Sequence, residues 1–275
     1  MAQKIWMITG ASRGIGAEIA KAVLASGDKL IATARDAHAL EHLGNRENVL
    51  AVSMDVTNEA QVKSGVAEGL ARFGRIDVLV NNAGFGMLGA IEETTAQEVE
   101  QVYRTNVFGL LNVTRAVLPI LRQQRSGRII NFSSLGGYRS SAGWGVYCST
   151  KFAVEGLTEA LHDELAPLGI HATVVEPGFF RTDFMDNRSL SKTEQRIADY
   201  ADTVGKTREA AAERNHQQPG DPVKLAKAIV TLANVAEPPL RLPLGKDAVE
   251  RIADKNAFVE RETERWRNLA ESTDY

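Results

Sequence analysis

Short apolar runs alternate with longer amphipathic stretches along most of the chain. Continuous apolar runs such as those within 4–10 and 171–178 are typical of strands buried on both faces, as in a parallel sheet. The stretches 16–27 and 59–74 carry apolar residues at helical spacing and predict helices that cover such a sheet. The alternation therefore predicts one α/β domain over residues 1–275, built on a doubly wound parallel sheet flanked by helices.

The other elements follow the same rhythm. Further strands are expected at 28–35, 48–56, 76–84 and 127–134, and further helices at about 95–123 and 145–168. Sheets of this kind bind ligands beyond the carboxyl ends of their strands. The polar residues that follow each strand are therefore the first candidates for function.

Two segments break the alternation. Residues of about 186–220 are polar, with helical patches between turn residues, and they are long for a connection in this fold class. We expect a mobile flap or short helical insert beside the substrate, with a plain surface excursion as the alternative. Residues of about 246–270 are expected to form an additional C-terminal helix whose charges mostly face solvent.

Composition narrows the class of protein. With 275 residues, 44% of them hydrophobic, the chain can bury a large core, and its net charge of −3 gives no sign of a nucleic-acid or membrane partner. Its apolar runs are too short to span a bilayer, and its N-terminus has no signal-peptide pattern. Cys148 is the one cysteine, so no intrachain disulfide can form and a cytoplasmic location is expected. His38 and His42 have a spacing found in metal ligands but no evident third partner, so no metal site is expected.

The stretch TGASRGIG, residues 9–16, joins the first expected strand to the first expected helix, which is the context of a phosphate-binding loop. Gly10 permits a tight turn, Gly14 lets backbone approach a pyrophosphate, and Gly16 lets the helix pack close to the sheet. The free N–H groups at the start of the helix favour a phosphate. The loop therefore predicts a dinucleotide site with contacts from Gly10, Ser12, Arg13, Gly14, Ile15 and Gly16.

The residues after the second strand bear on the choice of dinucleotide. A free ribose 2′-hydroxyl group usually meets an acidic side chain here, but Ala34 occupies that place and Arg35 follows it. Arg35 and Arg13 could hold a 2′-phosphate by charge-assisted hydrogen bonds, so NADP(H) is expected in preference to NAD(H). Asp36 would repel a phosphate if it pointed the same way, and we interpret it as the N-cap of the next helix.

Polar residues also follow the third and fourth strands. Asp55, with Val56, could accept a hydrogen bond from an adenine amino group, or it could cap the helix that starts near Asn58. The NNAG stretch after the fourth strand contributes three further candidate cofactor contacts, Asn82, Ala83 and Gly84. Their backbone could line the adenine ribose, or the stretch could be an ordinary turn.

Tyr147 and Lys151 lie four residues apart in a segment expected to be helical, so both side chains share one helical face. A free phenol has a pKa near 10, which is poor for proton transfer at neutral pH. A neighbouring ammonium group favours the phenolate and lowers that pKa. The pair is a candidate acid with its tuning charge, although pairs at this spacing are common by chance.

Several motifs occur together in a characteristic order. They are TGASRGIG, NNAG, Asn106 within RTNVFG, NFSS, YCSTK and EPG. With these motifs the chain resembles the short-chain dehydrogenase/reductase family over about residues 4–185. The resemblance implies a Rossmann-like fold, a nicotinamide cofactor, and hydride transfer to or from a carbonyl or alcohol carbon.

The resemblance also implies roles for single residues. Tyr147 matches the general acid/base of the family, and Lys151 matches the lysine that also holds the nicotinamide ribose. Ser134, thirteen residues before Tyr147, matches the serine that holds the carbonyl oxygen, with its neighbour Ser133 as the alternative. Asn106 matches the asparagine that holds a water molecule near Lys151. Beyond the EPG stretch, cofactor contacts are implied at Pro177, Gly178 and Thr182.

The chain departs from the family pattern near its end. Many members, including bacterial ketoacyl carrier-protein reductases, end with a V-D-G-G-like strand near residue 245, where this chain has PPLRLPLGKDAVERI and a further helix. This ending makes a carrier-protein substrate doubtful. It looks more like the branch that includes 17β-hydroxysteroid and retinol dehydrogenase-like proteins, which indicates a bulkier apolar alcohol or ketone.

The favoured function is therefore an NADP(H)-dependent oxidoreductase that acts on a ketone, aldehyde or secondary alcohol of apolar character. A non-redox enzyme on the same fold, such as an epimerase or dehydratase, and a non-catalytic NADP(H)-sensing protein are the alternatives. By analogy with relatives, the helices at about 95–123 and 145–168 are expected to form a homodimer or homotetramer contact.

Overall fold

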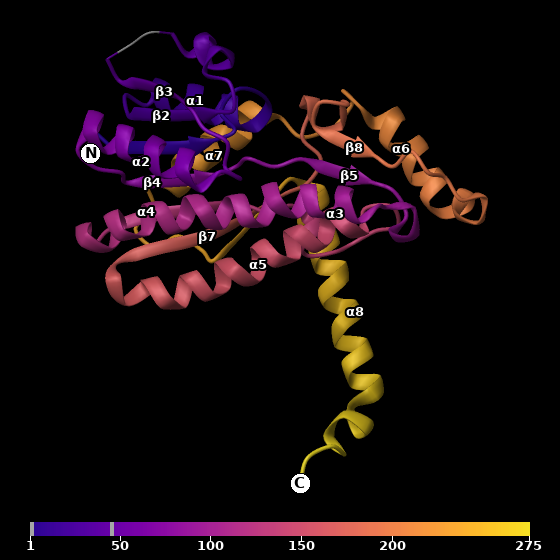
Figure 1. Ribbon diagram of the computed structural model, residues 1–275. Coiled ribbons are helices and arrows are strands. Elements are labelled where there is room, and N and C mark those ends of the chain that lie inside the picture. Colours follow the sequence, from indigo (N-terminus) through magenta and orange to yellow (C-terminus); the bar gives the residue numbers. More distant parts are fainter. Residues whose placement is uncertain (1–2, 45–46) are drawn as a thin grey trace.

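A parallel sheet forms the centre of the computed structural model, which describes residues 3–44 and 47–275 (Figure 1). Within those residues the sheet has the strand order β3-β2-β1-β4-β6-β7-β9, and each neighbouring pair is parallel. The strands are β1 (Ile5–Thr9), β2 (Lys29–Ala34), β3 (Val49–Ser53), β4 (Val78–Asn81), β6 (Gly127–Phe132), β7 (Ile170–Pro177) and β9 (Arg241–Leu244). The strand order reverses between β1 and β4, so the carboxyl ends of these strands form the crevice where doubly wound sheets bind ligands.

Helices cover both faces of the sheet, because successive side chains of a strand point to opposite sides. Trp6 and Ile8 of β1 pack in the core cluster beneath α1 and α7, whereas Ile5 and Met7 pack in the cluster beneath α2, α4 and α5. The covering helices are α1 (Gly14–Ala25), α2 (Glu59–Phe73), α4 (Leu110–Gln124), α5 (Gly145–Leu165) and α7 (Pro222–Leu232). Short 3₁₀ helices lie at Ala37–Leu43, Ile91–Glu93, Leu135–Gly137, Ala166–Leu168, Asp183–Met185 and Ala198–Tyr200. The predicted doubly wound, Rossmann-like fold is confirmed.

The helix expected at 95–123 is not continuous. It consists of α3 (Ala96–Tyr103), a π-helical turn (Arg104–Gly109) and then α4. The turn contains Asn106, whose amide group bonds to backbone outside the helix. A π-helical turn inserts a residue into the helix and turns the following side chains, which often happens at functional sites.

Residues 186–220, which we call the flap segment, contain a strand as well as helices. β8 (Leu190–Lys192) pairs in parallel with β5 (Gly86–Leu88), and a π-helical turn (Ala201–Gly205) leads into α6 (Lys206–Arg214). Figure 1 shows these elements together beside the end of the main sheet.

A buried ion pair attaches the flap segment to the body. The Glu93 side chain is 1% exposed and accepts hydrogen bonds from the N–H groups of Ala90 (2.8 Å) and Ile197 (2.9 Å). Arg208 of α6 donates to the same carboxylate at 2.5 Å. Burial by itself would raise the pKa of Glu93, but these donors, with Arg208 the strongest, lower it to about 2.

The end of the chain forms a strand, although its residues depart there from the V-D-G-G-like family pattern. β9 pairs with β7, and its Leu242 and Leu244 pack against the core.

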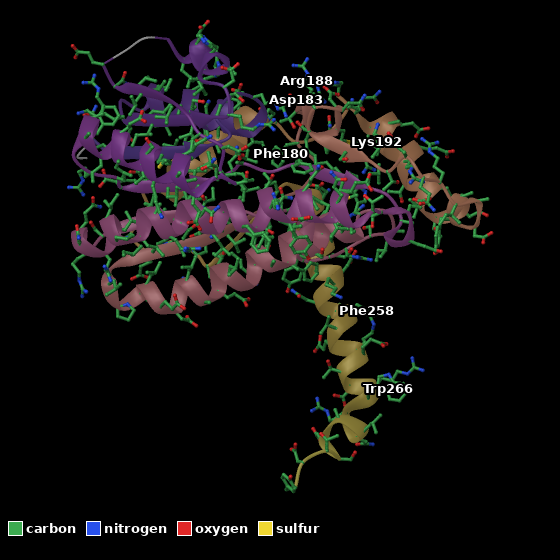
Figure 2. All side chains as sticks on the ribbon, in the orientation of Figure 1. Phe180, Asp183, Arg188, Lys192, Phe258 and Trp266 are labelled. Carbon is green, nitrogen blue, oxygen red and sulfur yellow. The ribbon has the colours of Figure 1, made fainter. Side chains whose placement is uncertain are left out.

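The expected C-terminal helix follows as α8 (Lys246–Glu271), and Figure 1 shows it projecting from the body. Figure 2 shows Phe258 and Trp266 on the projecting part. In the described part of the chain, no helix is long and apolar enough to cross a membrane.

Arg208→Met should lower the free energy of unfolding by about 3 kcal/mol, because it leaves the Glu93 carboxylate buried without its partner. The matched control is Lys206→Met on the same helix, which removes only an exposed ion pair with Asp202 and should change stability little. Urea denaturation followed by circular dichroism measures both variants. Equal stability of the two variants would show that the buried pair does not anchor the flap segment.

Candidate active site

A cavity of about 880 Å³ lies at the carboxyl ends of the central strands. Eighteen of the nineteen residues predicted as site residues line it, and Asn106 is the exception. The predicted residues among those that line the cavity are Gly10, Ser12, Arg13, Gly14, Ile15, Gly16, Arg35, Asp55, Val56, Asn82, Ala83, Gly84, Ser134, Tyr147, Lys151, Pro177, Gly178 and Thr182. Residues spread over most of the chain are thus brought to one site by the shared direction of the strands.

The glycine loop needs its glycines for two different reasons. Gly10 (φ +67°) and Gly14 (φ +54°) occupy the left-handed region, which costs little only for glycine. Gly16 instead allows a close approach, because a Cβ atom there would overlap the carbonyl oxygen of Gly10 and the side-chain amide of Asn82. The start of α1 can therefore lie directly against the end of β1.

Hydrogen bonds hold the loop against the turn after β4. The Thr9 hydroxyl group accepts from the N–H groups of Asn82 and Ala83, both at 3.0 Å. The Asn82 amide donates to the carbonyl oxygens of Thr9 (3.0 Å) and Gly10 (3.1 Å). These bonds fix the walls of the cavity beside the start of α1, and the N-terminus of a helix favours a phosphate.

The charged residues near the glycine loop, Arg13, Arg35 and Asp36, differ in the contacts that they make. Asp36 accepts a hydrogen bond from His38 N–H at 3.0 Å, so it caps the following 3₁₀ helix as we expected. Arg35 forms no ion pair within the described residues. Arg13, in contrast, lies 3.7 Å from Asp183 and donates to the carbonyl oxygen of Arg188 at 2.6 Å.

These contacts link the glycine loop to the segment after β7, on which Figure 2 labels Asp183 and Arg188. The sequence carried no signal for this pairing, because the residues are about 170 positions apart.

The residues after β3 form hydrogen bonds with residues close to them in the sequence. Asp55 accepts from Thr57 N–H at 2.8 Å, whereas Asn58 caps α2. Asp55 therefore lines the cavity while another residue caps the helix.

Tyr147 and Lys151 are both buried on α5, next to the end of β6. The Lys151 ammonium group donates to the Phe132 carbonyl oxygen at 2.8 Å and lies 5.9 Å from the centre of the Tyr147 ring. Trp144 and Phe184 pack against the same ring, with centroid distances of 5.9 and 5.8 Å. The phenol group is therefore held between a cation and two aromatic walls.

Burial dominates the ionisation of this pair. It raises the pKa of Tyr147, and the hydrogen bond with Ser134 opposes it only in part. Burial also lowers the pKa of Lys151 to about 8, although the charge of Glu155 acts in the opposite direction. Removal of the phenol from water dominates the pKa of Tyr147 in this structure, and a lowering of that pKa by Lys151 stays a prediction.

Asn106 lies behind the cavity wall. Its amide nitrogen donates to Phe85 carbonyl oxygen (3.0 Å) and to the hydroxyl group of Thr150 (3.1 Å), and its oxygen accepts from Phe85 N–H (3.0 Å). A Cβ atom on Gly84 would lie 3.0 Å from the Asn106 oxygen and 3.6 Å from the Lys151 nitrogen. The asparagine therefore positions the backbone at Gly84 and Phe85, next to Lys151.

The backbone after β7 has a support that we did not predict. Asp247, in the first turn of α8, accepts from Phe179 N–H at 2.8 Å, and its carboxylate occupies the space that a Cβ atom on Gly178 would take. Cys148 is buried and lines the same cavity, and burial raises the pKa of its thiol.

Comparison with known proteins identifies the family. The short chain dehydrogenase family model matches residues 4–193. Oxidoreductase BOA17 of Botryotinia fuckeliana is 41% identical over 97% of this chain and 98% of its own length. A 3-ketodihydrosphingosine reductase of Bacteroides thetaiotaomicron is 39% identical over 89% of each protein. A short-chain dehydrogenase structure from Streptomyces avermitilis is 42% identical, with a TM-score of 0.93 over 100% of both chains.

The chain therefore belongs to the short-chain dehydrogenase family, and it is an oxidoreductase of the class that acts on CH–OH or C=O groups. Solved relatives hold both kinds of dinucleotide. One from Burkholderia phymatum, 25% identical with a TM-score of 0.83 over 94% and 95% of the two chains, is in complex with NAD. Another, ElxO, 28% identical with a TM-score of 0.74 over 90% and 100%, has NADP bound. Members of the family thus bind NAD(P)(H).

Two Gly→Ala variants test the packing of the loop. Gly16→Ala should lower the free energy of unfolding by about 1–3 kcal/mol, because the new methyl group must displace the Gly10 carbonyl group. Gly156→Ala, in an open position on α5, should instead be neutral or slightly stabilising, because alanine favours a helix. Thermal unfolding compares the two. A neutral Gly16→Ala would show that the helix does not need the close approach.

Proposed function

We propose that this protein transfers a hydride between NADP(H) and a ketone, aldehyde or secondary alcohol of apolar character. The main observation that supports this proposal is that Tyr147, Ser134 and Lys151 line the same cavity as the glycine loop. A proton donor, an oxygen-binding hydroxyl group and a cation thus share one space with a dinucleotide cradle. This combination suits the reduction of a carbonyl group.

NADPH would supply the hydride, and the protein supplies orientation and proton transfer. The hydroxyl group of Ser134 accepts a hydrogen bond from Gly136 N–H and also bonds the Tyr147 phenol, and it would turn its proton to the substrate's carbonyl oxygen. As the carbonyl carbon gains a hydride, its oxygen becomes basic and takes the proton of Tyr147. The raised pKa of Tyr147 keeps this proton in place until then. Lys151 stabilises the phenolate that remains.

The same pocket offers a consistent set of cofactor contacts. We assign the pyrophosphate to the loop Ser12–Gly16 at the start of α1, and the adenosine to the residues after β3 and β4. The nicotinamide would lie on the backbone of Pro177 and Gly178, where Asp247 holds the turn. Thr182 and Lys151 are assigned to the carboxamide and the ribose hydroxyl groups.

The preference for a 2′-phosphate depends on Arg35. This side chain lines the cavity and is without an ion pair among the described residues, while the neighbouring Asp36 is turned towards His38. Arg13 lies on the same cavity, although its contacts with Asp183 and Arg188 must rearrange for it to bind a phosphate. Arg35 is therefore the main determinant in this proposal.

The walls near Tyr147 indicate the kind of substrate. Phe85, Trp144 and Phe184 pack in one cluster with Tyr147, and they line the cavity together with Leu135 and Phe179. Aromatic and aliphatic walls favour an apolar substrate. A relative named 3-ketodihydrosphingosine reductase supports a ketone as the reacting group.

We also propose that the protein forms a homo-oligomer through the face that carries α4 and α5. Phe108, just before α4, is 53% exposed, and Phe152 on α5 is 46% exposed. Large exposed apolar side chains on adjacent helices are typical of an interface.

The direct test follows absorbance at 340 nm with purified protein, NADPH and a panel of ketones, aldehydes, quinones and steroids. Stoichiometric NADPH oxidation with one apolar carbonyl class is the expected result. If NADPH binds and no member of a broad panel is reduced, the epimerase, dehydratase and sensor alternatives would replace this proposal.

Tyr147→Phe should lower turnover by at least about 10³-fold, because it removes the proton donor. Its affinity for NADPH, measured by fluorescence titration, should stay close to the wild-type value. Tyr103→Phe is the matched control, since this phenol bonds Ser149 outside the cavity lining, and it should keep its activity. Near-normal turnover of Tyr147→Phe would remove Tyr147 from the mechanism.

Arg35→Ala should lower kcat/KM with NADPH by about 10–100-fold, the loss expected for charge-assisted hydrogen bonds to a phosphate. Activity with NADH should change little in the same variant, which makes NADH the internal control. Steady-state kinetics with both dinucleotides give the comparison. Equal losses with NADPH and NADH would mean that Arg35 does not recognise the 2′-phosphate.

A further inference from the structure

A cluster of charged side chains that the proposed mechanism does not use lies directly behind Lys151. Glu155 of α5 is 5% exposed, and Glu176 of β7 is 1% exposed. Arg241 of β9 forms ion pairs with both, at 2.8 Å to Glu176, and also with Glu159 on the outer side of α5. One guanidinium group therefore serves three carboxylates, two of them in the interior.

Because the cluster has fewer positive than negative groups, the ionised form of Glu155 is disfavoured. Burial raises the pKa of Glu155 to about 7, the neighbouring Glu176 acts in the same direction, and Ser133 and Arg241 oppose it. Arg241 keeps its charge, because its hydrogen bonds to Glu159 and Glu176 outweigh partial burial and raise its pKa. Glu155 is therefore the member of the cluster that changes charge near neutral pH.

Glu155 is placed to act on Lys151. The two residues lie one helical turn apart on α5, and both are buried, so little water screens their interaction. A shared neighbour, Ser133, donates its hydroxyl group to the Lys151 carbonyl oxygen at 3.4 Å. The charge of Glu155 favours the ammonium form of Lys151, against the effect of burial.

We propose that Glu155 is a positioning residue whose carboxylate, held between Arg241 and Glu176, keeps the Lys151 ammonium group charged and so extends catalysis to higher pH. The inference rests on the proposed function, since Glu155 acts on the reaction only through Lys151. The charged or polar groups around Glu155 are Lys151 and Glu159 on its own helix, Glu176 on β7, Arg241 on β9 and Ser133 after β6. The Tyr138 ring lies against the Arg241 guanidinium group, with 5.5 Å from that group to the ring centre.

The mechanism has a signature in the pH profile. Below about pH 6, Glu155 is neutral in the wild-type protein and Lys151 is charged without its help. Above pH 7, Glu155 is ionised and holds the proton on Lys151, whose pKa is about 8. If removal of this carboxylate lowers the pKa of Lys151 by about one unit, the charged fraction at pH 8.5 falls about eightfold, whereas at pH 6 it barely changes.

The experiment measures kcat/KM for NADPH-dependent reduction from pH 5.5 to 9.5. Glu155→Gln should match the wild type at pH 6 and lie about fivefold to tenfold below it at pH 8.5. Glu155→Asp keeps the charge and should keep most of the activity at pH 8.5. The matched control is Glu159→Gln, which removes the 53% exposed carboxylate that bonds to the same guanidinium group, and its profile should follow the wild type.

A loss that is equal at all pH values in Glu155→Gln would overturn the inference, because it would indicate damaged packing. An unchanged profile would overturn it as well. Far-UV circular dichroism checks folding first, and Glu155→Ala serves as the second neutral variant should the glutamine variant not fold.

Thermal unfolding gives a readout that does not depend on activity. The folded pKa of Glu155 lies above its ordinary value of 4.5, so its contribution to stability is complete below pH 4.5 and is lost as the pH rises through about 7. The wild type should therefore lose stability relative to Glu155→Gln between pH 5 and 8. If the wild type loses stability in this way but the kinetic pH profiles of the two proteins are the same, the proposed effect of Glu155 on Lys151 would be wrong. Absence of turnover in the wild type would instead be a failure of the proposed function.

Discussion

The constraint on which the site depends is a lysine ammonium group held in the interior of the protein. Removing Lys151 from water costs free energy, and the fold offsets this cost with the Phe132 carbonyl oxygen at the end of β6 and the carboxylate of Glu155 one turn along α5. Tyr147 lies one turn along α5 in the other direction, and it lines the cavity with its ring beside that charge. A lysine that were fully solvated would have little effect on a buried phenol. Burial and function are therefore two aspects of the same arrangement.

The parallel sheet makes this arrangement possible by collecting the carboxyl ends of its strands at one edge. The loops after β1 and β4 are joined through Thr9 and Asn82, and the close approach at Gly16 leaves a cradle without side chains. The end of β6 supplies the groups around Lys151, and β9 brings Arg241 to the buried carboxylates. Arg241 of the last strand thus contacts the carboxylates next to the active site. This strand lies outside residues 4–193, the part that the family model matches.

Most of the sheet and eighteen of the residues that line the cavity could be predicted from sequence, because they depend on local patterns. Apolar periodicity marks buried strands, and the glycine loop and the spacing of Tyr147 and Lys151 are short motifs. What could not be predicted depends on contacts between distant residues. The π-helical turn at Asn106, the pairing of Glu93 with Arg208 and the support of Phe179 by Asp247 have no local signature. The raised pKa of Tyr147 was missed for the same reason, since burial is a property of the whole fold.

The most direct test of the central claim follows the hydride itself. NADPH deuterated at the transferable position of C4 is incubated with the protein and a carbonyl compound that it reduces, and the product is analysed by mass spectrometry and proton NMR. The account predicts one deuterium atom on the carbinol carbon, and none on that carbon when unlabelled NADPH is used in D₂O. Deuterium on the carbinol carbon from D₂O, or a product without deuterium from labelled NADPH, would contradict hydride transfer between the nicotinamide and the substrate.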